Sequence, residues 1–166
     1  MSRPKLVVLP GDGVGPEVIA EARRILGWLE TNRAFDCEVV EHPYGFHVFK
    51  ELGTLYGPGV IDDARQADAV LFGAMGGPDY DDIPPSVRRQ GSVLRLRREL
   101  KLFANLRPSR GIVEIADAVP FKREVIEGVD NLIVREANAG IYFGEPRGIE
   151  TLPNGFERGV NTLVYE

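Results

Sequence analysis

The sequence predicts an α/β protein built on a mostly parallel sheet with helices on both faces. Three observations predict this fold: apolar runs that are continuous rather than alternating, stretches of helical periodicity between those runs, and glycine-rich turns where the runs end. A strand that is apolar throughout is buried on both faces, as in parallel sheets whose crossover helices cover both sides. The 166 residues, 43% hydrophobic and 27% charged, have the composition of an ordinary globular protein.

The chain begins with a predicted strand, a tight turn and a helix. Residues 5–9 form a Val-rich apolar run, which the turn residues 10–13 close. From Pro16 onward, apolar residues recur at helical spacing. Pro16 suits the first helical position, and Glu17 suits the positive end of the helix dipole. A strand, a glycine turn and a helix in this order begin a parallel βαβ unit.

Further strands and helices alternate up to residue 100. We expect a strand at 37–40, a short helix at 60–67 that leads into an apolar strand at 69–72, and a helix at 93–100. The intervening segment 73–85 holds three Gly and three Pro and is therefore a loop. This loop begins at the carboxyl end of a strand, where open α/β sheets bind their ligands.

The rest of the chain is of a different kind. Strands are expected at 102–106 and 131–134. The runs 141–143 and 160–165 are separated by a Gly/Pro/Asn-rich connection, so residues 140–166 are expected to form an extended antiparallel ribbon. Because a two-stranded ribbon is marginally stable alone, it is expected to pack against another chain or segment.

Charge and composition exclude several classes of function. The net charge of −5 argues against general binding to nucleic acid or to an anionic membrane. No apolar stretch reaches the roughly 18 residues that span a bilayer, no signal peptide is recognised, and the single Cys37 cannot form an internal disulfide. The sequence therefore predicts a cytoplasmic protein with neither nucleic acid nor membrane as a partner.

One segment carries concentrated positive charge. Residues 88–110 contain eight basic side chains and one acid, although the chain as a whole is acidic. Arginine clusters of this kind suit a small polyanionic substrate, since the guanidinium group pairs with carboxylates or phosphates in a bidentate way. The alternative is that several of these arginines, Arg88, Arg89, Arg95, Arg98 and Arg110, form a solvated helix face.

Other candidate groups are less specific. The glycines of residues 11–15 do not have the spacing of a dinucleotide fingerprint, so a structural turn and a ligand-binding turn both remain open. Tyr142 follows Arg135 and could act as a general acid or pack in the ribbon. His42 and His47 have no acidic partner at triad spacing and are expected to be surface residues.

Several motifs together resemble the β-decarboxylating dehydrogenase family, which includes isopropylmalate, isocitrate, homoisocitrate and tartrate dehydrogenases. The motifs are LPGDGVGPE at 9–17, GAMGGP at 73–78, LRLRR at 94–98, LFANLRP at 102–108, VRE at 134–136 and GIYFGEPRG at 140–148. Of these motifs, LFANLRP and GIYFGEPRG are most similar to those of the isopropylmalate dehydrogenases within the family. The resemblance spans essentially the whole chain and implies an isocitrate/isopropylmalate dehydrogenase-like fold.

The resemblance also implies site residues and chemistry. It implies oxidation of a 2-hydroxy dicarboxylate by NAD followed by metal-assisted loss of carbon dioxide. Tyr142 matches the tyrosine that protonates the resulting enolate. Three arginines match those that bind the substrate carboxylates in the family: Arg97, Arg107 and Arg135. Val93 and Leu94 match the apolar residues that contact the side group of the substrate.

Cofactors and partners follow from the same resemblance. The implied NAD-contacting positions are Gly76, Gly77, Pro78 and Gln90, where Gln90 replaces the glutamate usual in isopropylmalate enzymes. The implied metal is Mg²⁺ or Mn²⁺, with no ligand in this segment. Family members are about twice as long, and the part absent here carries the catalytic lysine, the metal-binding aspartates and the main NAD loop. The resemblance further implies a homodimer through the arm 140–166.

The expected organisation is a first part of the large α/β domain at 1–102 and a first part of the second domain at 103–166. The expected function is oxidative decarboxylation of 3-isopropylmalate. Isocitrate, homoisocitrate or tartrate remain alternative substrates, and isocitrate would call for a polar residue such as Ser92 near Val93. A non-catalytic chain that pairs with another subunit is the alternative from a different class.

Overall fold

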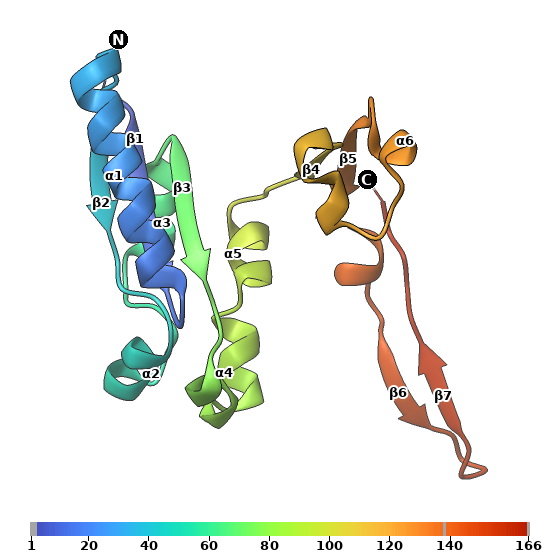
Figure 1. Cartoon of the computed structure of the whole chain (residues 1–166). Helices are drawn as coiled ribbons and strands as arrows, with labels where there is room; N and C mark the ends of the chain where they lie inside the picture. Colours follow the sequence, from blue (N-terminus) through green and yellow to red (C-terminus); the bar gives the residue numbers. More distant parts are fainter. Residues whose placement is uncertain (1–2, 138, 166) are drawn as a thin grey trace. The chain divides into compact units, whose positions relative to one another are not determined.

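The structure, a computed structural model, describes residues 3–137 and 139–165, without the side chain of Tyr142. It divides into two units, one up to Leu100 and one from Lys101 onward (Figure 1). No helix among the described residues is long and apolar enough to cross a membrane.

The first unit contains a parallel three-stranded sheet. Its strands are β1 (Lys5–Gly11), β2 (Glu38–Glu41) and β3 (Ala69–Ala74), in the order β2-β1-β3. In the centre of the sheet, Val7, Val8 and Leu9 of β1 are fully buried. The predicted parallel sheet is confirmed, because β1 pairs with both β2 and β3 in the parallel sense. Its buried central strand needs cover on both faces.

Helices cover the two faces of this sheet. The connection from β1 to β2 contains α1 (Gly15–Arg33), and the connection from β2 to β3 contains α3 (Val60–Gln66). These connections cross the sheet in opposite directions, and right-handed crossovers then place their helices on opposite faces. Figure 1 shows α1 on one side of the sheet and α3 on the other.

Shorter helices complete the first unit and its core. They are α2 (Phe46–Leu52), the 3₁₀ turn η1 (Pro78–Asp82), α4 (Pro85–Gln90) and α5 (Val93–Glu99). The core cluster joins the sheet to these helices and the loops between them. Its buried members are Val7, Leu9, Tyr44, Leu55, Val60, Ile83 and Leu96. The segment that carries α5 is therefore anchored in the same core as β1.

The second unit is built on antiparallel pairs. Strands β4 (Ala104–Arg110) and β5 (Asp130–Glu136) pair along their whole length. Between them lie η2 (Val113–Ala118) and α6 (Arg123–Ile126), and after them come η3 (Gly140–Tyr142) and the ribbon of β6 (Gly148–Thr151) and β7 (Glu157–Val160).

The predicted ribbon exists, but its strands lie elsewhere. Residues 141–143 are not a strand, because Gly140 has φ +62° and the amide of Gly144 donates to the Gly140 carbonyl at 3.0 Å. Of the run 160–165, only the first residue belongs to β7. The ribbon strands are polar, with Arg158 paired across to Glu150. A search for apolar runs misses them because both faces of the ribbon meet solvent.

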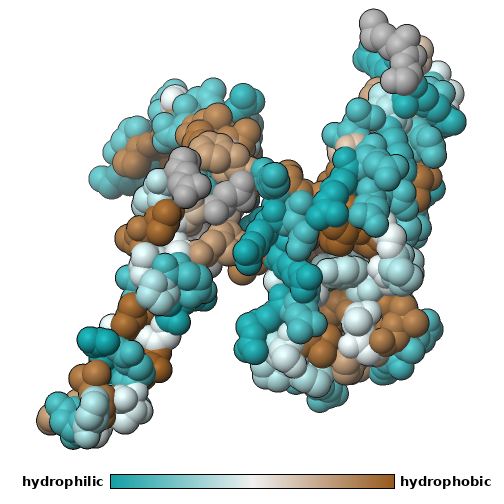
Figure 2. All heavy atoms as spheres, turned by 180° about the vertical axis from the view of Figure 1, so that it is seen from behind, coloured by the Kyte–Doolittle hydropathy of each residue, from teal (hydrophilic) through white to brown (hydrophobic). Residues whose placement is uncertain are grey.

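The second unit exposes much apolar surface. Among its described residues, Ala116 is the one buried hydrophobic side chain. On β4 and β5, by contrast, Leu106, Leu132 and Val134 are each more than half exposed. Hydrophobic patches are visible on the molecular surface (Figure 2). Exposed apolar patches are typical of surfaces that bind another segment, chain or ligand.

Candidate functional site

Two glycine-rich turns meet at the carboxyl ends of β1 and β3. Gly11 pairs with Ala74, and the amide of Asp12 donates to the Ala74 carbonyl at 2.8 Å. A Cβ on Gly13 would lie 2.8 Å from the carbonyl oxygen of Gly76. Only glycine permits this approach, so the turns 11–15 and 73–77 form one backbone surface at the ligand-binding edge of the sheet.

The second of these turns is open above its backbone. Gly76 and Gly77 have φ of +111° and +150°, and a Cβ on Gly76 would meet no atom within 4 Å. Pro78 follows as the first residue of η1. The structure thus places three of the predicted cofactor-contacting residues on one exposed turn, whereas Gln90 lies exposed at the end of α4.

Asp12 holds this edge together, and the motif analysis did not single it out. Its Oδ1 accepts a hydrogen bond from the Phe46 amide at 2.7 Å, at the start of α2. Gly45 lies so close that a Cβ there would be 2.2 Å from the same oxygen. The other oxygen, Oδ2, is buried and has no hydrogen-bond partner within the described part of the chain. The sequence signal that could have pointed to Asp12 is its position between the two turn glycines Gly11 and Gly13.

Three predicted substrate-contacting residues lie on α5. Val93 and Arg97 are four positions apart and Leu94 and Arg97 three, so these side chains share one side of the helix. Leu96, three positions after Val93, is 4% exposed in the core. Val93 and Arg97 are half-buried, while Leu94 is 49% exposed. The buried Leu96 thus anchors α5 in the core, and Leu94 is the most exposed of the three candidate residues.

The second unit brings two predicted arginines onto one face. Arg135 of β5 pairs with Asn105 of β4, and Arg107 lies two residues further along β4. Cross-strand partners and residues two apart point to the same side of a sheet, so all three side chains share a face. The Nε of Arg107 donates to the Oδ1 of Asn105 at 2.8 Å. This bond is made by Nε alone, and the Arg107 side chain is exposed.

Other basic residues of the cluster are engaged with acids. Arg88 pairs with Asp81 at 3.1 Å, Arg95 with Glu99 at 3.7 Å and Arg110 with Asp130 at 3.3 Å. Arg110 lies on the opposite face of β4 from Arg107, because it follows Arg107 by three positions, an odd step along the strand. Tyr142 ends η3, and its side chain lies outside the described residues.

The expectation for His42 is corrected by the structure. Its Nε2 lies 2.8 Å from Oδ2 of Asp63, and Lys5 Nζ lies 2.9 Å from the other oxygen of the same carboxylate. Hydrogen bonds from Lys5 and His42 lower the pKa of Asp63 below its usual range. Sequence spacing missed this partner because α3 is brought beside the strands only by the fold. The cluster ties α3 to the sheet and lies away from the glycine turns.

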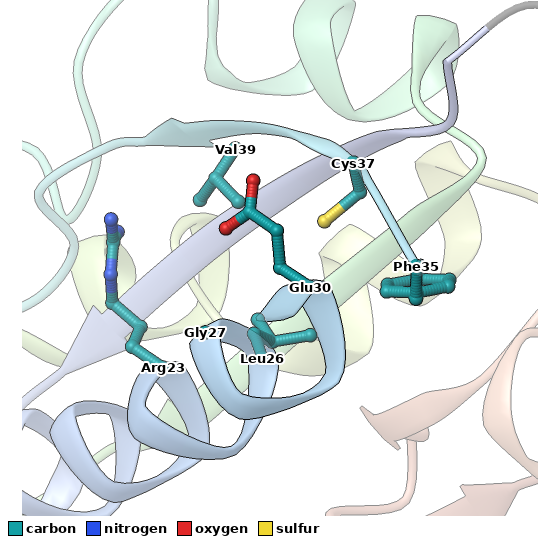
Figure 3. Close-up of a pocket in the computed structure, with 7 residues that line it drawn as sticks. All are labelled: Arg23, Leu26, Gly27, Glu30, Phe35, Cys37 and Val39. Carbon is teal, nitrogen blue, oxygen red and sulfur yellow. The ribbon is translucent and has the colours of Figure 1, made fainter. Parts of the chain in front are cut away.

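A shallow groove lies at the other end of the sheet. It has a volume of about 230 Å³ between the second half of α1 and the residues before and within β2. Figure 3 shows Leu26, Gly27 and Glu30 on the helix, with Cys37 and Val39 facing them. Most of this lining lies near the amino end of β2, so the groove is separate from the ligand-binding edge. Among the described residues, no three Asp, Glu, His or Cys side chains gather to hold a metal ion.

A doubly wound sheet with glycine turns at its carboxyl edge is the architecture of α/β enzymes that bind their ligands there. A profile of the isocitrate/isopropylmalate dehydrogenase family matches residues 5–166. The chain belongs to this family.

Its relatives include enzymes named 3-isopropylmalate dehydrogenase. That of Paramagnetospirillum magneticum is 46% identical over 99% of this chain, and that of Gluconobacter oxydans is 48% identical over 97%. The aligned region is 45% and 44% of those relatives, so the chain spans slightly less than half of their length.

Solved structures agree on the fold. A β-decarboxylating dehydrogenase from Thermococcus kodakarensis matches with a TM-score of 0.65 and 32% identity, over 97% of this chain and 41% of that protein. An isocitrate dehydrogenase from Methylococcus capsulatus matches with a TM-score of 0.67 over 96% of this chain and 42% of its own. At 19% identity the second match concerns the fold alone.

Proposed function

We propose that the protein oxidatively decarboxylates 3-isopropylmalate to 2-oxoisocaproate with NAD, as a step of leucine biosynthesis in the cytoplasm. The observation that carries this proposal is the 46–48% identity, over nearly the whole chain, to enzymes named 3-isopropylmalate dehydrogenase. Because those relatives are about twice as long, the proposal concerns the enzyme of which this chain forms the amino-terminal half. This half supplies substrate-binding groups and the Tyr142 hydroxyl.

The arginines bind the two carboxylates of the substrate in this proposal. The shared face of Arg107 and Arg135 supports it, since two guanidinium groups on one face can each take a carboxylate in a bidentate pair. Arg97 on α5 supplies the third cationic group. The hydrogen bond from Arg107 to Asn105 fixes the plane of the guanidinium group before substrate arrives, which reduces the entropy lost on binding.

The side group of the substrate is assigned to Val93 and Leu94. An isopropyl group gains from contact with apolar side chains, and Leu94 offers one that is 49% exposed beside Arg97. Isocitrate would instead need a polar partner, for which Ser92 is the candidate. Its hydroxyl already donates to the Arg89 carbonyl at 3.0 Å and accepts from the Arg95 amide at 3.2 Å. This engagement favours 3-isopropylmalate over isocitrate.

The nicotinamide end of NAD is assigned to the open glycine turn. The backbone of Gly76 and Gly77 has room above it that a side chain would fill, and Pro78 and Gln90 complete the assignment. NAD would supply the hydride acceptor for oxidation of the hydroxyl-bearing carbon, and the glycine turn would hold its nicotinamide end at the sheet edge.

Tyr142 is assigned the proton transfer that follows loss of carbon dioxide. Its hydroxyl donates a proton to the carbon that has lost its carboxylate, and thereby converts the enolate into the 2-oxo acid. As the family resemblance implies, the proposal places the ligands of Mg²⁺ or Mn²⁺ in the other half of the enzyme and assigns none to this chain.

In this proposal, the ribbon of β6 and β7 forms the contact between the two subunits of a homodimer. Two apolar side chains, Ile149 of β6 and Phe156 just before β7, are 75% and 70% exposed. A two-stranded ribbon has too little buried surface to be stable alone, and pairing with a second subunit would supply it. The exposed ribbon also supports the alternative that the chain associates with a separate subunit.

The test joins this chain to the remaining part of the Paramagnetospirillum magneticum relative and follows NADH formation. We expect activity with 3-isopropylmalate and at least tenfold less with isocitrate or tartrate. Arg107→Lys keeps the charge but loses the bidentate geometry, and should lower kcat/KM by about 1.5–3 kcal/mol in transition-state free energy. Arg110→Lys, on the other face of the same strand, is the matched control and should change little.

Two results would contradict the proposal. A joined enzyme that is folded but oxidises isocitrate in preference to 3-isopropylmalate would reverse the substrate assignment. Equal effects of Arg107→Lys and Arg110→Lys would remove Arg107 from the substrate site.

A further inference from the structure

Tyr44 makes an unusual contact for a core aromatic residue. It is fully buried between β2 and α2, and its hydroxyl donates a hydrogen bond of 2.5 Å to the carbonyl of Gly91. The two residues lie 47 positions apart in the sequence. Gly91 directly precedes Ser92, the residue that caps α5. The bond therefore links the sheet-side core to the start of the helix that carries three proposed substrate contacts.

The ring of Tyr44 is held on two sides. It stacks on Tyr56 with ring centroids 5.4 Å apart, and the ring of Phe72 from β3 meets it edge-on at 5.2 Å. Burial raises the pKa of Tyr44 above its ordinary value, so the hydroxyl keeps its proton and remains a donor. A clamped ring with a fixed donor sets the position of the group that accepts the bond.

Gly91 is fixed from a second direction. A Cβ there would lie 2.4 Å from the Cβ of Leu55, so the backbone of Gly91 packs directly on a buried side chain. Its amide donates to the Val87 carbonyl at 2.9 Å and closes α4. The junction between α4 and α5 is thus defined by packing on one side and by the Tyr44 hydroxyl on the other.

We infer that the Tyr44 hydroxyl is a positioning group that sets where α5 presents Val93, Leu94 and Arg97 to the substrate. The chain is fixed at Gly91, just before the cap of α5, and the helix itself is anchored at its middle by the buried Leu96. Loss of the bond leaves a buried carbonyl without a partner, which favours displacement of the junction toward water. This inference rests on the proposed function, because it concerns the substrate contacts of that same site.

The test uses Tyr44→Phe, which removes the hydroxyl and keeps the ring. Tyr56→Phe is the matched control, because it removes a hydroxyl from the same ring pair that makes no hydrogen bond within the described residues. In the joined enzyme, Tyr44→Phe should raise KM for 3-isopropylmalate about tenfold, with kcat and the KM for NAD changed less than about twofold. The substrate contacts of α5 act equally in the ground and transition states, so their loss appears in KM.

Hydrogen exchange of the 166-residue chain provides a measurement that does not need activity. In Tyr44→Phe, we expect the α5 amides, including that of Leu96, which donates to Ser92, to exchange about tenfold faster, with the β1 amides unchanged. Unchanged exchange in α5, or a KM equal to that of Tyr56→Phe, overturns the inference. An inactive wild-type joined enzyme contradicts the proposed function, and the exchange result then still decides whether Tyr44 positions α5.

Discussion

Two glycines of the first unit make a matched pair for testing the turn that forms the candidate site. Gly11 ends β1 with φ +79°, and a Cβ there would lie 1.8 Å from the carbonyl oxygen of Ala74. Gly27 lies inside α1, and a Cβ there would meet no atom within 4 Å. The same substitution, glycine to alanine, therefore meets opposite environments at the two positions.

The expected effects have opposite signs. Gly11→Ala forces an L-residue into the left-handed region and pushes β1 away from β3, which should cost about 2–5 kcal/mol of the free energy of unfolding. Gly27→Ala adds a better helix former without a clash, which should add about 0.5–1 kcal/mol. Against a total stability of about 5–15 kcal/mol for a domain, the first change is severe and the second is mild.

Urea unfolding of the chain measures both effects. The sequence contains one tryptophan, Trp28 on α1, so its fluorescence reports on the first unit, and circular dichroism follows the whole chain. Midpoints are comparable if the slope m stays constant between variants. A Gly11→Ala variant as stable as the wild type, or a Gly27→Ala variant less stable than it, would refute the account of the glycine turn.

Three further predictions concern the first unit. Leu9→Ala empties a fully buried core position and should cost about 2–5 kcal/mol in urea unfolding. Ser92→Ala removes the cap of α5 and should cost about 1 kcal/mol, which thermal unfolding would detect as a lower Tm. Because the folded pKa of Asp63 is lowered, its stabilising effect is present above the unfolded value of about 4 and is lost as the pH falls through the folded value. The Tm gap between wild type and Asp63→Asn should therefore narrow below about pH 4, and a gap independent of pH would contradict this linkage.

The first strand, its turn and α1 could be predicted from sequence because the determinants are local. Residues 5–9 are continuously apolar, and Pro16 marks the helix start, so neighbouring residues alone specify this segment. The strands of the ribbon could not be found in the same way, since Glu150 and Arg158 pair in solvent and leave no apolar pattern. The strand predicted at 141–143 is wrong for the opposite reason. An apolar pattern is present there, but the run folds into a 3₁₀ turn between two glycines.

The candidate site residues divide in the same way, into features that local sequence predicts and features that depend on contacts between distant segments. The resemblance of short motifs was enough to nominate Arg107 and Arg135, but their common face depends on the register that opposes Arg135 to Asn105. Register arises from pairing between distant strands, and a slip of one residue would reverse the face. Likewise, the Tyr44 contact to Gly91 and the His42 contact to Asp63 join segments whose spacing in the sequence carries no information about contact.

The two units differ in how they hold their candidate residues in place. In the first unit, Leu96 and Gly91 tie α5 to a buried core, so Val93, Leu94 and Arg97 are positioned by this chain alone. In the second unit, β4 and β5 carry arginines on one face and more than half-exposed Leu106, Leu132 and Val134 on the other. The free energy available to order that pair comes mostly from whatever covers its apolar face. Precise placement of Arg107 and Arg135 is therefore coupled to burial of the opposite face, and in the proposed function the affinity for 3-isopropylmalate should rise with the association that stabilises the second unit.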